Sequence, residues 1–422
     1  MLLSEAKSET YEKFLERKKN ELSLFGLTEF NFVKSSNQPI LDIIHKKREA
    51  QAQMISNFTL DNAQVRNTNR NDSSLQFGSF DCDYEYQRYD IEIMKKDFLK
   101  FFYNCNYNEY SYYFTNSGMS SIFATLYALN QCGYAIKPLG NMYCETERMI
   151  DDYMQSNTNK DKLTKNALFV DTTYIGSIAE LLNNTDLSLY DCFILDTTNF
   201  IGDETLPIIT IFEKYNKMIF LVRSHIKLDM VGAEWSKLGS ICLLKVPKID
   251  FKEIEISKAV LNHIKIILGF IGGYAYPESM PLIWDHPKFK QISETRVEKI
   301  RFNTKKLYNK IKDKLPNLDV CKPNHELFLF VRLFNDLDYK TLEKDIHNFA
   351  DNAKANGLLC YADSYGLDHY SLNGYYEGMS ATSEVIRISP ADFPEEINEQ
   401  VANEIIKWLG EYLSKNKENR HE

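Results

Sequence analysis

The sequence predicts an α/β protein whose larger domain holds a mostly parallel sheet with helices on both faces. Between about residues 110 and 245, short apolar runs alternate with helical patterns. Uninterrupted apolar runs suit strands that are covered on both faces, as the strands of a parallel sheet are. These runs end in polar residues, and ligands of such sheets bind at the carboxyl ends of the strands. We therefore expect a ligand site at that edge of the sheet.

Each element follows from its local pattern. Strands are expected at 111–116, 166–173, 189–199, 217–224 and 239–246, and a helix of period 3.6 at 120–131. The apolar stretch 259–276 contains His263 and Lys265 and is broken by two glycines, so we interpret it as a buried helix and turn rather than a membrane span. A helix at 290–315, strands at 326–334 and 384–391, and a closing helix at 395–415 predict a smaller α+β domain.

Composition excludes several classes of protein. The net charge of -9 argues against a nucleic-acid-binding role, because phosphate backbones require a basic face. The first 25 residues form a charged amphipathic helical pattern, which is not the pattern of a signal peptide. The eight cysteines include no C-x-x-C pair, so we expect free thiols in a reducing cytoplasm, with neither a disulfide scaffold nor a metal site.

The turn before the helix at 120–131 is built from small residues, Asn116-Ser117-Gly118-Met119. A helix that starts here offers free N–H groups and the positive end of its dipole to an anion. Gly118 would let a phosphate approach the backbone. The alternative is that these residues only cap the helix.

Three further side chains carry possible chemistry. Asp196 ends a buried strand, where a carboxylate needs a cation or a strong donor, although it is equally a helix cap or turn residue. Lys227 follows another buried strand, three residues after Ser224, and a desolvated lysine can form a Schiff base, although a solvated loop lysine is the simpler reading. Arg387 lies in a strand among apolar neighbours and suits a carboxylate, or an ordinary salt bridge.

The order of these features favours one cofactor. A glycine turn, an aspartate, a lysine and a C-terminal arginine are the groups that pyridoxal 5'-phosphate (PLP) needs for its phosphate, its ring nitrogen, its aldehyde and the carboxylate of an amino acid substrate.

These stretches resemble the Cys/Met-metabolism family of PLP enzymes, of fold type I, which includes cystathionine γ-synthase, cystathionine γ-lyase and methionine γ-lyase. The resemblance runs from about residue 80 to about residue 415. NSGMSSI resembles the family's phosphate turn, which implies that Ser117, Gly118 and Met119 hold the phosphate. YEYQRYD resembles the segment that reaches the phosphate of a neighbouring subunit, which implies that role for Tyr86 and Arg88.

Four further motifs carry cofactor roles. NMYCETE implies that Tyr143 stacks on the cofactor ring and assists proton transfer. FVDTT places Asp171 at the family's glutamate, and FILDTTN places Asp196 at the pyridine nitrogen, with Thr198 beside the cofactor. RSHIK places Ser224 on the phosphate and makes Lys227 the Schiff-base lysine.

The substrate side of the resemblance rests on fewer residues. DSYGL implies that Ser364 lies near the substrate carboxylate, and VIRISPADFPEEI implies that Arg387 binds it. Glu145 stands where the family has a small residue and is expected to be an extra acid or base toward the substrate. The chain departs from the family at Ile175, where an asparagine is usual, and at Ile226, where a threonine is usual.

The resemblance implies a PLP-dependent lyase of carbon–heteroatom bonds, or a transferase of γ-replacement, acting on an amino acid. Two alternatives stay open: other fold-type-I chemistry (transamination, aldol-type cleavage or decarboxylation) and a non-catalytic protein of this fold. We expect an N-terminal helical arm at 1–80 that reaches a neighbouring subunit, a PLP-binding domain at 81–285 with a seven-stranded sheet, and a C-terminal domain at 286–422. The expected assembly is a cytoplasmic homodimer or homotetramer without nucleic-acid or membrane partners.

Overall fold

The structure is a computed structural model, and it describes most of the chain. The described residues are 8–28, 38–61, 74–77, 80–83, 92–93, 98–105, 110–155, 163–235, 237–244, 251–276, 279–332, 339–355, 357–376 and 384–418. They divide into two compact units: the first comprises 1–52, 231–233 and 291–422, and the second comprises 53–230 and 234–290. The N-terminal residues to 52 thus group with the segment from 291 onward, and the division expected at residues 80 and 285, with an arm that reaches a neighbouring subunit, stays a prediction.

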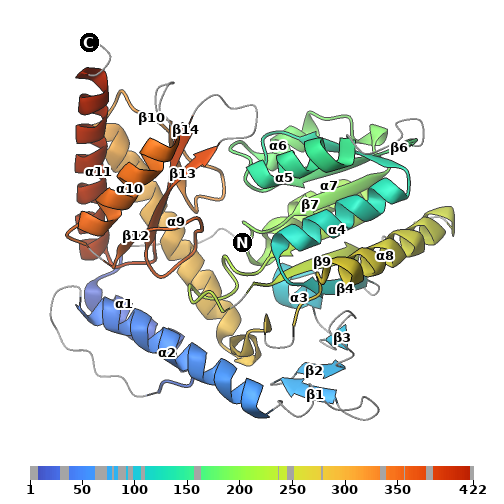
Figure 1. Cartoon of the computed structure of the whole chain (residues 1–422), viewed down its shortest axis with the longest axis horizontal. Coiled ribbons are helices and arrows are strands. Elements are labelled where there is room, and N and C mark those ends of the chain that lie inside the picture. The colour runs from blue at the N-terminus through green and yellow to red at the C-terminus, as the bar shows by residue number, and fades with distance from the viewer. Residues whose placement is uncertain are drawn as a thin grey trace. The chain divides into compact units, whose positions relative to one another are not determined.

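The second unit is built on a six-stranded sheet (Figure 1). Its strands are β4 (Tyr110–Thr115), β9 (Gly239–Leu244), β8 (Met218–Ser224), β7 (Cys192–Asp196), β6 (Lys165–Asp171) and β5 (Tyr134–Leu139), in that spatial order. β5, β6, β7 and β8 pair in parallel, and β9 runs antiparallel to both of its neighbours.

The prediction of a mostly parallel sheet is confirmed, but the count of seven strands is wrong for the described residues. After β5 the chain continues into α5 (Cys144–Met149) and a π-helical turn, η1 (Ile150–Gln155). The five strands expected from apolar runs are all present, somewhat shorter than expected. β5 was not expected because Lys137 and Pro138 interrupt its apolar pattern.

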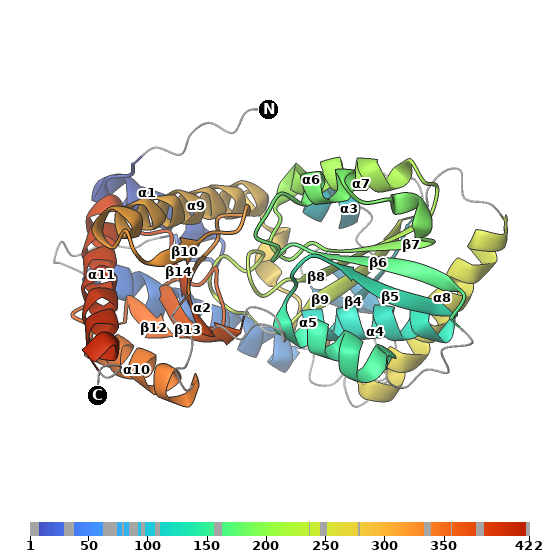
Figure 2. The same cartoon turned by 90° about the horizontal axis from the view of Figure 1, so that it is seen from above.

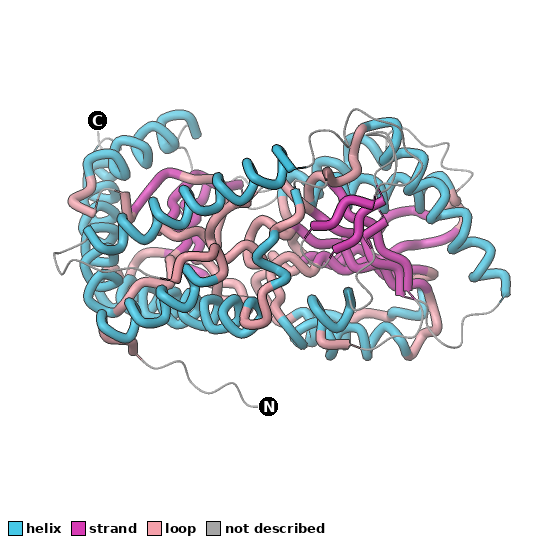
Figure 3. Tube along the Cα trace, turned by 90° about the horizontal axis from the view of Figure 1, so that it is seen from below, coloured by secondary structure: helices cyan, strands magenta, loops and turns pink. Residues whose placement is uncertain are grey.

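Helices cover both faces of this sheet (Figures 2 and 3). On one face lie α4 (Gly118–Gln131), α5 and α8 (Phe251–Ile271), and on the other lie α3 (Phe98–Tyr103), α6 (Ile178–Asn183) and α7 (Leu206–Glu213). The first layer buries Leu126 and Ile264 against Phe220 and Ile194 of the central strands. A small antiparallel sheet of β1 (Ser74–Phe77), β2 (Phe80–Asp83) and β3 (Glu92–Ile93) belongs to the same unit.

The stretch 259–276 is a helix and a turn, as expected. Gly272 takes a left-handed conformation with φ of 61° directly after α8. In the part of the chain that the structure describes, no helix combines the length and apolar character needed to cross a bilayer.

The first unit has a five-stranded sheet in the order β10 (Asp319–Cys321), β11 (Leu329–Arg332), β14 (Glu384–Ser389), β13 (Tyr370–Tyr376) and β12 (Leu359–Tyr361). Its helices are α1 (Tyr11–Ser23), α2 (Gln38–Asp61), α9 (Phe289–Lys314), α10 (Tyr339–Asn352) and α11 (Glu395–Glu418). The expected long helix, the closing helix and the two expected strands correspond to α9, α11, β11 and β14.

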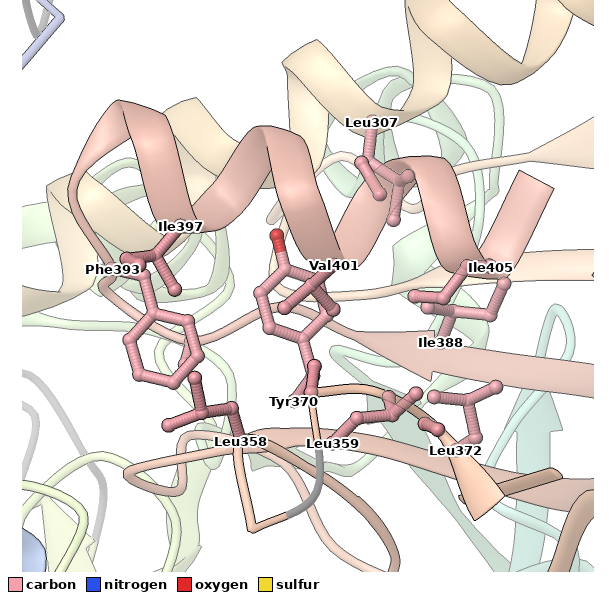
Figure 4. Close-up of a cluster of buried hydrophobic side chains, with 14 of the residues drawn as sticks. Leu307, Leu358, Leu359, Tyr370, Leu372, Ile388, Phe393, Ile397, Val401 and Ile405 are labelled. Atoms are coloured by element: carbon pink, nitrogen blue, oxygen red, sulfur yellow. The ribbon is translucent and has the colours of Figure 1, made fainter. Parts of the chain in front are cut away.

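The core of the first unit joins sheet and helices, as Figure 4 shows for Tyr370, Val401 and Ile405. Residues of α1 and α2, among them Phe14 and Ile43, are buried in this same core. The N-terminal helices are therefore a structural part of the first unit.

Candidate functional site

The edge of the six-stranded sheet gathers most of the predicted site residues. Thr115, at the end of β4, pairs with Gly239, which pairs in turn with Ser224 at the end of β8. Asp171 and Asp196 are paired at the ends of β6 and β7. Since parallel strands end at the same edge, the residues that follow these strands come together there. They are Ser117, Gly118, Met119, Tyr143, Asp171, Asp196, Thr198, Ser224 and Lys227.

The amino end of α4 presents free backbone donors. Ser117 is the N-cap, and its Oγ accepts from the backbone N–H of Ser120 at 3.1 Å. The N–H groups of Gly118 and Met119 have no acceptor among the residues that the structure describes, as the first turn of a helix predicts. A Cβ at position 118 would lie 2.6 Å from Cβ of Ser224, so only glycine lets β8 and α4 approach this closely. The geometry and helix dipole suit an anion.

Asp196 is tied to the end of β8 through one hydroxyl. The backbone N–H and Oγ1 of Thr198 donate to Oδ1 of Asp196 at 2.9 and 2.6 Å. The same Oγ1 accepts from the backbone N–H of Ser224 at 3.0 Å. Thr198 therefore fixes the relative positions of Asp196 and Ser224. Both hydrogen bonds from Thr198 go to the same carboxylate oxygen of Asp196, Oδ1.

Asp171 is a second buried carboxylate beside Asp196. Its Oδ2 accepts from the backbone N–H of Tyr143 at 2.8 Å, and its Oδ1 accepts from that of Thr173 at 2.7 Å. Burial raises the pKa of Asp171. Burial, and then the charge of Asp171, raise the pKa of Asp196 to about 7. A cation bound at Asp196 would offset both effects.

Lys227 lies, half-buried, in the turn that follows β8. Flanking side chains hold this turn in a buried network. Arg223 donates from Nε and Nη2 to the two carboxylate oxygens of Asp229, both at 2.7 Å. Nδ1 of His225 lies 2.7 Å from Asp229 Oδ2, and its Nε2 lies 2.8 Å from Oγ of Ser240.

The charge state of this network follows from its contacts. Although burial opposes ionisation, the Arg223 guanidinium lowers the pKa of Asp229 to about 2. Burial lowers the pKa of His225, so the imidazole is neutral near pH 7. Because a carboxylate only accepts, His225 donates from Nδ1 to Asp229 and accepts from Ser240 at Nε2. The turn is thus fixed on both sides of Lys227.

The sequence patterns predict Lys227 and Ser224 as site residues but do not predict the buried network of Arg223, His225 and Asp229 around them. His225 and Asp229 stand two residues before and after Lys227, and that symmetric spacing was the available signal. Lys237, the next lysine along the chain after Lys227, is exposed.

Glu145, expected to face the substrate, is also exposed, in the first turn of α5. Ile175 and Ile226, where the chain departs from the family pattern, are partly buried. Tyr86 and Arg88 lie outside the described residues.

Arg387 and Ser364 belong to the first unit. Strand alternation directs Ile386 and Ile388 into the core of that unit and Arg387 to the opposite face of the sheet. Arg387 is 4% exposed, and its Nε donates to Oδ1 of Asn373 at 3.0 Å. The guanidinium carbon lies 5.8 Å from the ring centre of Phe328 and 5.9 Å from that of Tyr365. Ser364 is partly buried, and its backbone oxygen accepts from Oγ of Ser371.

Comparison of the sequence with known protein families and with curated proteins gives no match. A solved structure of an archaeal alanine:glyoxylate aminotransferase superposes with a TM-score of 0.51 at 13% identity, over 96% of this chain and 99% of that chain. An alanine aminotransferase from Pyrococcus furiosus superposes with a TM-score of 0.49 at 10% identity, over 85% of this chain and 88% of that chain. An aminotransferase from Eubacterium rectale superposes with a TM-score of 0.46 at 11% identity, over 93% of this chain and 98% of that chain. The chain has the α/β fold of the fold-type-I transferases.

Proposed function

We propose that the protein is a PLP-dependent enzyme that acts on an amino acid, with Lys227 as the residue that attaches covalently to the cofactor. The observation that carries this proposal is the set of groups at one sheet edge. These are a helix N-terminus with free N–H groups at Gly118 and Met119, a buried carboxylate at Asp196, and a half-buried lysine in a fixed turn. A phosphate, a protonated ring nitrogen and an aldehyde are the partners that these groups require.

The residues present fit the cofactor. The N–H groups of Gly118 and Met119, with Ser117 and Ser224 beside them, would hold the phosphate. Asp196, whose pKa is raised to about 7 by burial and by Asp171, would be stabilised as an anion by a protonated ring nitrogen. When bound, PLP supplies an electron sink for the charge that develops at the substrate Cα.

The chain's own groups would then manage the protons. The amine of Lys227 would take the proton from the substrate Cα. Asp196 would keep the proton on the ring nitrogen. Tyr143, whose backbone N–H is bound by Asp171, would stack its ring on the cofactor and assist proton transfer. Arg387, buried and held by Asn373, is proposed to bind the substrate carboxylate, with Ser364 near it.

The reaction that we favour is transfer of the amino group to a 2-oxo acid. The solved structure with a TM-score of 0.51 is named an alanine:glyoxylate aminotransferase, and this likeness of fold supports transamination ahead of elimination. Elimination or replacement at Cβ or Cγ is the second candidate, favoured by the resemblance of the segments around Gly118 and Tyr143 to the Cys/Met-metabolism family. An extra acid or base role for Glu145 belongs to that candidate.

The products separate the two reactions. The PLP-loaded protein is incubated with single amino acids, with and without a 2-oxo acid, and amino acids, 2-oxo acids and ammonia are measured. Transamination consumes the added 2-oxo acid and forms a new amino acid without releasing ammonia. Elimination consumes water, needs no added 2-oxo acid, and releases ammonia with the leaving group. No product from any amino acid would favour a non-catalytic protein of this fold.

A homodimer or homotetramer is proposed on the resemblance of the segment with Tyr86 and Arg88 to one that acts across a subunit interface. Light scattering of the PLP-loaded protein tests this, since a monomeric mass at full cofactor occupancy contradicts it.

A further inference from the structure

A group of buried charged side chains lies in the first unit and includes none of the residues assigned above. Its members come from the N-terminal segment with α1 and α2, from α9, and from two C-terminal loops, and each is at most 12% exposed. They are Glu9, Arg17, Lys18, Glu21, Lys47, Arg296, Asp368 and Asp392. The group thus holds four cations and four anions, and none of the eight has a role in the proposed chemistry.

Lys47 of α2 is the most deeply buried of these charges, with no exposed side-chain surface. Its Nζ lies 2.5 Å from Oε1 of Glu21 and 2.7 Å from Oδ2 of Asp368. The same Nζ donates to the backbone oxygen of Val231. Burying an ammonium group costs several kcal/mol unless it is paired and hydrogen-bonded, and Lys47 meets that requirement with two carboxylates and this carbonyl.

The carbonyl that Lys47 binds belongs to a strained residue. Val231 has a φ of 45°, in the left-handed region that β-branched residues rarely adopt. Gly232 follows with a φ of 82°, and a Cβ there would lie 2.6 Å from Nη2 of Arg296 and from Oδ1 of Asp368. Such a conformation persists only where the surroundings impose it, and it is concentrated at functional sites.

The strained residue continues directly from the Lys227 turn. Val231 stands four residues after Lys227 and two after Asp229. Asp229 is held by Arg223 and His225, and its backbone oxygen accepts from Nε1 of Trp284 at 2.7 Å. The turn is therefore anchored at 229 by one buried network and at 231 by another, with Met230 between them.

We propose that Lys47 is a positioning residue for the Lys227 turn: by binding the Val231 carbonyl, it imposes the left-handed backbone that fixes the downstream end of the turn. The consequence for catalysis rests on the proposed function of Lys227. The effect of Lys47 on the backbone at Val231 does not rest on that function. The positioning role and the proposed function can therefore fail separately.

The test is amide hydrogen exchange of the full-length chain without added cofactor, read from peptides that cover residues 225–235. Lys47→Met should accelerate exchange in these peptides about tenfold or more, because the backbone at 231 loses its restraint. Peptides from α4 should exchange as in the wild type. Lys46→Met is the matched control: Lys46 is the preceding residue of α2, is exposed, and pairs only with Glu49 among the described residues, so its removal should change nothing.

A second variant separates this role from general loosening of the buried charges. Glycine adopts a φ of 45° without support, so Lys47→Met should accelerate exchange less than about threefold when Val231→Gly is already present. If Lys47→Met accelerates amide exchange equally with Val231 and with Val231→Gly, the proposal is overturned. The same holds if the acceleration is spread evenly over the first unit. If Lys47→Met does not fold, Lys47→Gln takes its place in the same comparison, with the same criterion.

A last measurement connects the backbone to Lys227. PLP is added, and borohydride is added at intervals to fix a pyridoxyl group on any lysine that has bound PLP. The rate at which Lys227 acquires this label should fall at least threefold in Lys47→Met, and Val231→Gly should restore it. If wild-type Lys227 captures no label while the exchange results hold, the proposed function fails and the positioning role stands. Capture at the wild-type rate despite fast exchange refutes the positioning of Lys227.

Discussion

Asp171 and Asp196 are register partners at the carboxyl ends of β6 and β7, and the charge of Asp171 adds to burial in raising the pKa of Asp196 to about 7. Two buried carboxylates at neighbouring strand ends oppose each other's ionisation, so the pair makes a place where a cation is strongly favoured. This relationship links the sheet topology directly to the proposed binding of a protonated ring nitrogen.

The pair predicts a pH-dependent stability for the chain without cofactor. The folded state holds a proton on Asp196 that the unfolded state releases near pH 4, so stability falls as pH rises from about 4 through 7. Asp196→Asn cannot lose that proton. Its melting temperature relative to wild type should therefore be higher at pH 8 than at pH 5, whereas Asp203→Asn, at an exposed position, should show no such trend. A difference independent of pH would show that Asp196 is not titrating as described.

Thr198→Val tests the link between Asp196 and Ser224. Valine keeps the shape but removes the hydroxyl that donates to Asp196 and accepts from Ser224. The loss should cost about 1–3 kcal/mol in the free energy of unfolding, because buried partners are left unsatisfied. Thr210→Val on α7 is the control, since among the described residues its exposed hydroxyl donates to the backbone oxygen of Leu206 in the same helix. Denaturant titration measures both, and equal costs would contradict a special role for Thr198.

The fold was largely predictable from the chain, and the departures have physical causes. Strands buried on both faces give uninterrupted apolar runs, which is why β6, β7, β8 and β9 were located. β5 and β13 carry polar residues within their spans and gave no such signal. The N-terminal helices show an amphipathic pattern, but such a pattern does not specify which surface they cover. In the structure, Phe14 and Ile43 pack in the core of the first unit.

The position of the candidate site residues in the fold was predictable to a similar extent, whereas their roles stay predictions. Order along the chain identified the residues that follow strands, because the carboxyl ends of parallel strands share an edge. The ion network of Arg223, His225 and Asp229 was not identified, since pairing between side chains depends on backbone geometry that spacing alone does not fix. The same holds for the contact of Lys47 with Val231, which joins residues far apart in the sequence.

Asp229→Asn, in the Lys227 turn, should be strongly destabilising. It removes the carboxylate charge that pairs with the buried Arg223 guanidinium and that accepts from His225. Breaking a buried pair costs about 3–5 kcal/mol. Asp152→Asn removes an exposed partner of Arg148 and should cost less than about 1 kcal/mol. Thermal unfolding of both variants gives the comparison, and a small loss in Asp229→Asn would contradict the network's role.

Arg387→Ala should weaken amino acid binding by roughly 30-fold or more, since one partner of a desolvated charge pair is lost. Arg387→Lys should restore little, because lysine cannot form the bidentate fork. Attachment of the cofactor should persist in both. Arg332→Ala, on the neighbouring strand β11 and paired with Asp319, is the control. Titration with amino acids measures the affinities, and wild-type affinity in Arg387→Ala would refute the carboxylate role.

The central claim is that Lys227 carries the cofactor, and one measurement addresses it directly. The protein is loaded with PLP, reduced with borohydride, digested, and its peptides are mapped by mass spectrometry. We predict a single pyridoxyl group on Lys227, absent from Lys227→Ala and unaffected by Lys237→Ala. A pyridoxyl group on Lys237, or no stable labelling at saturating PLP, would contradict the account.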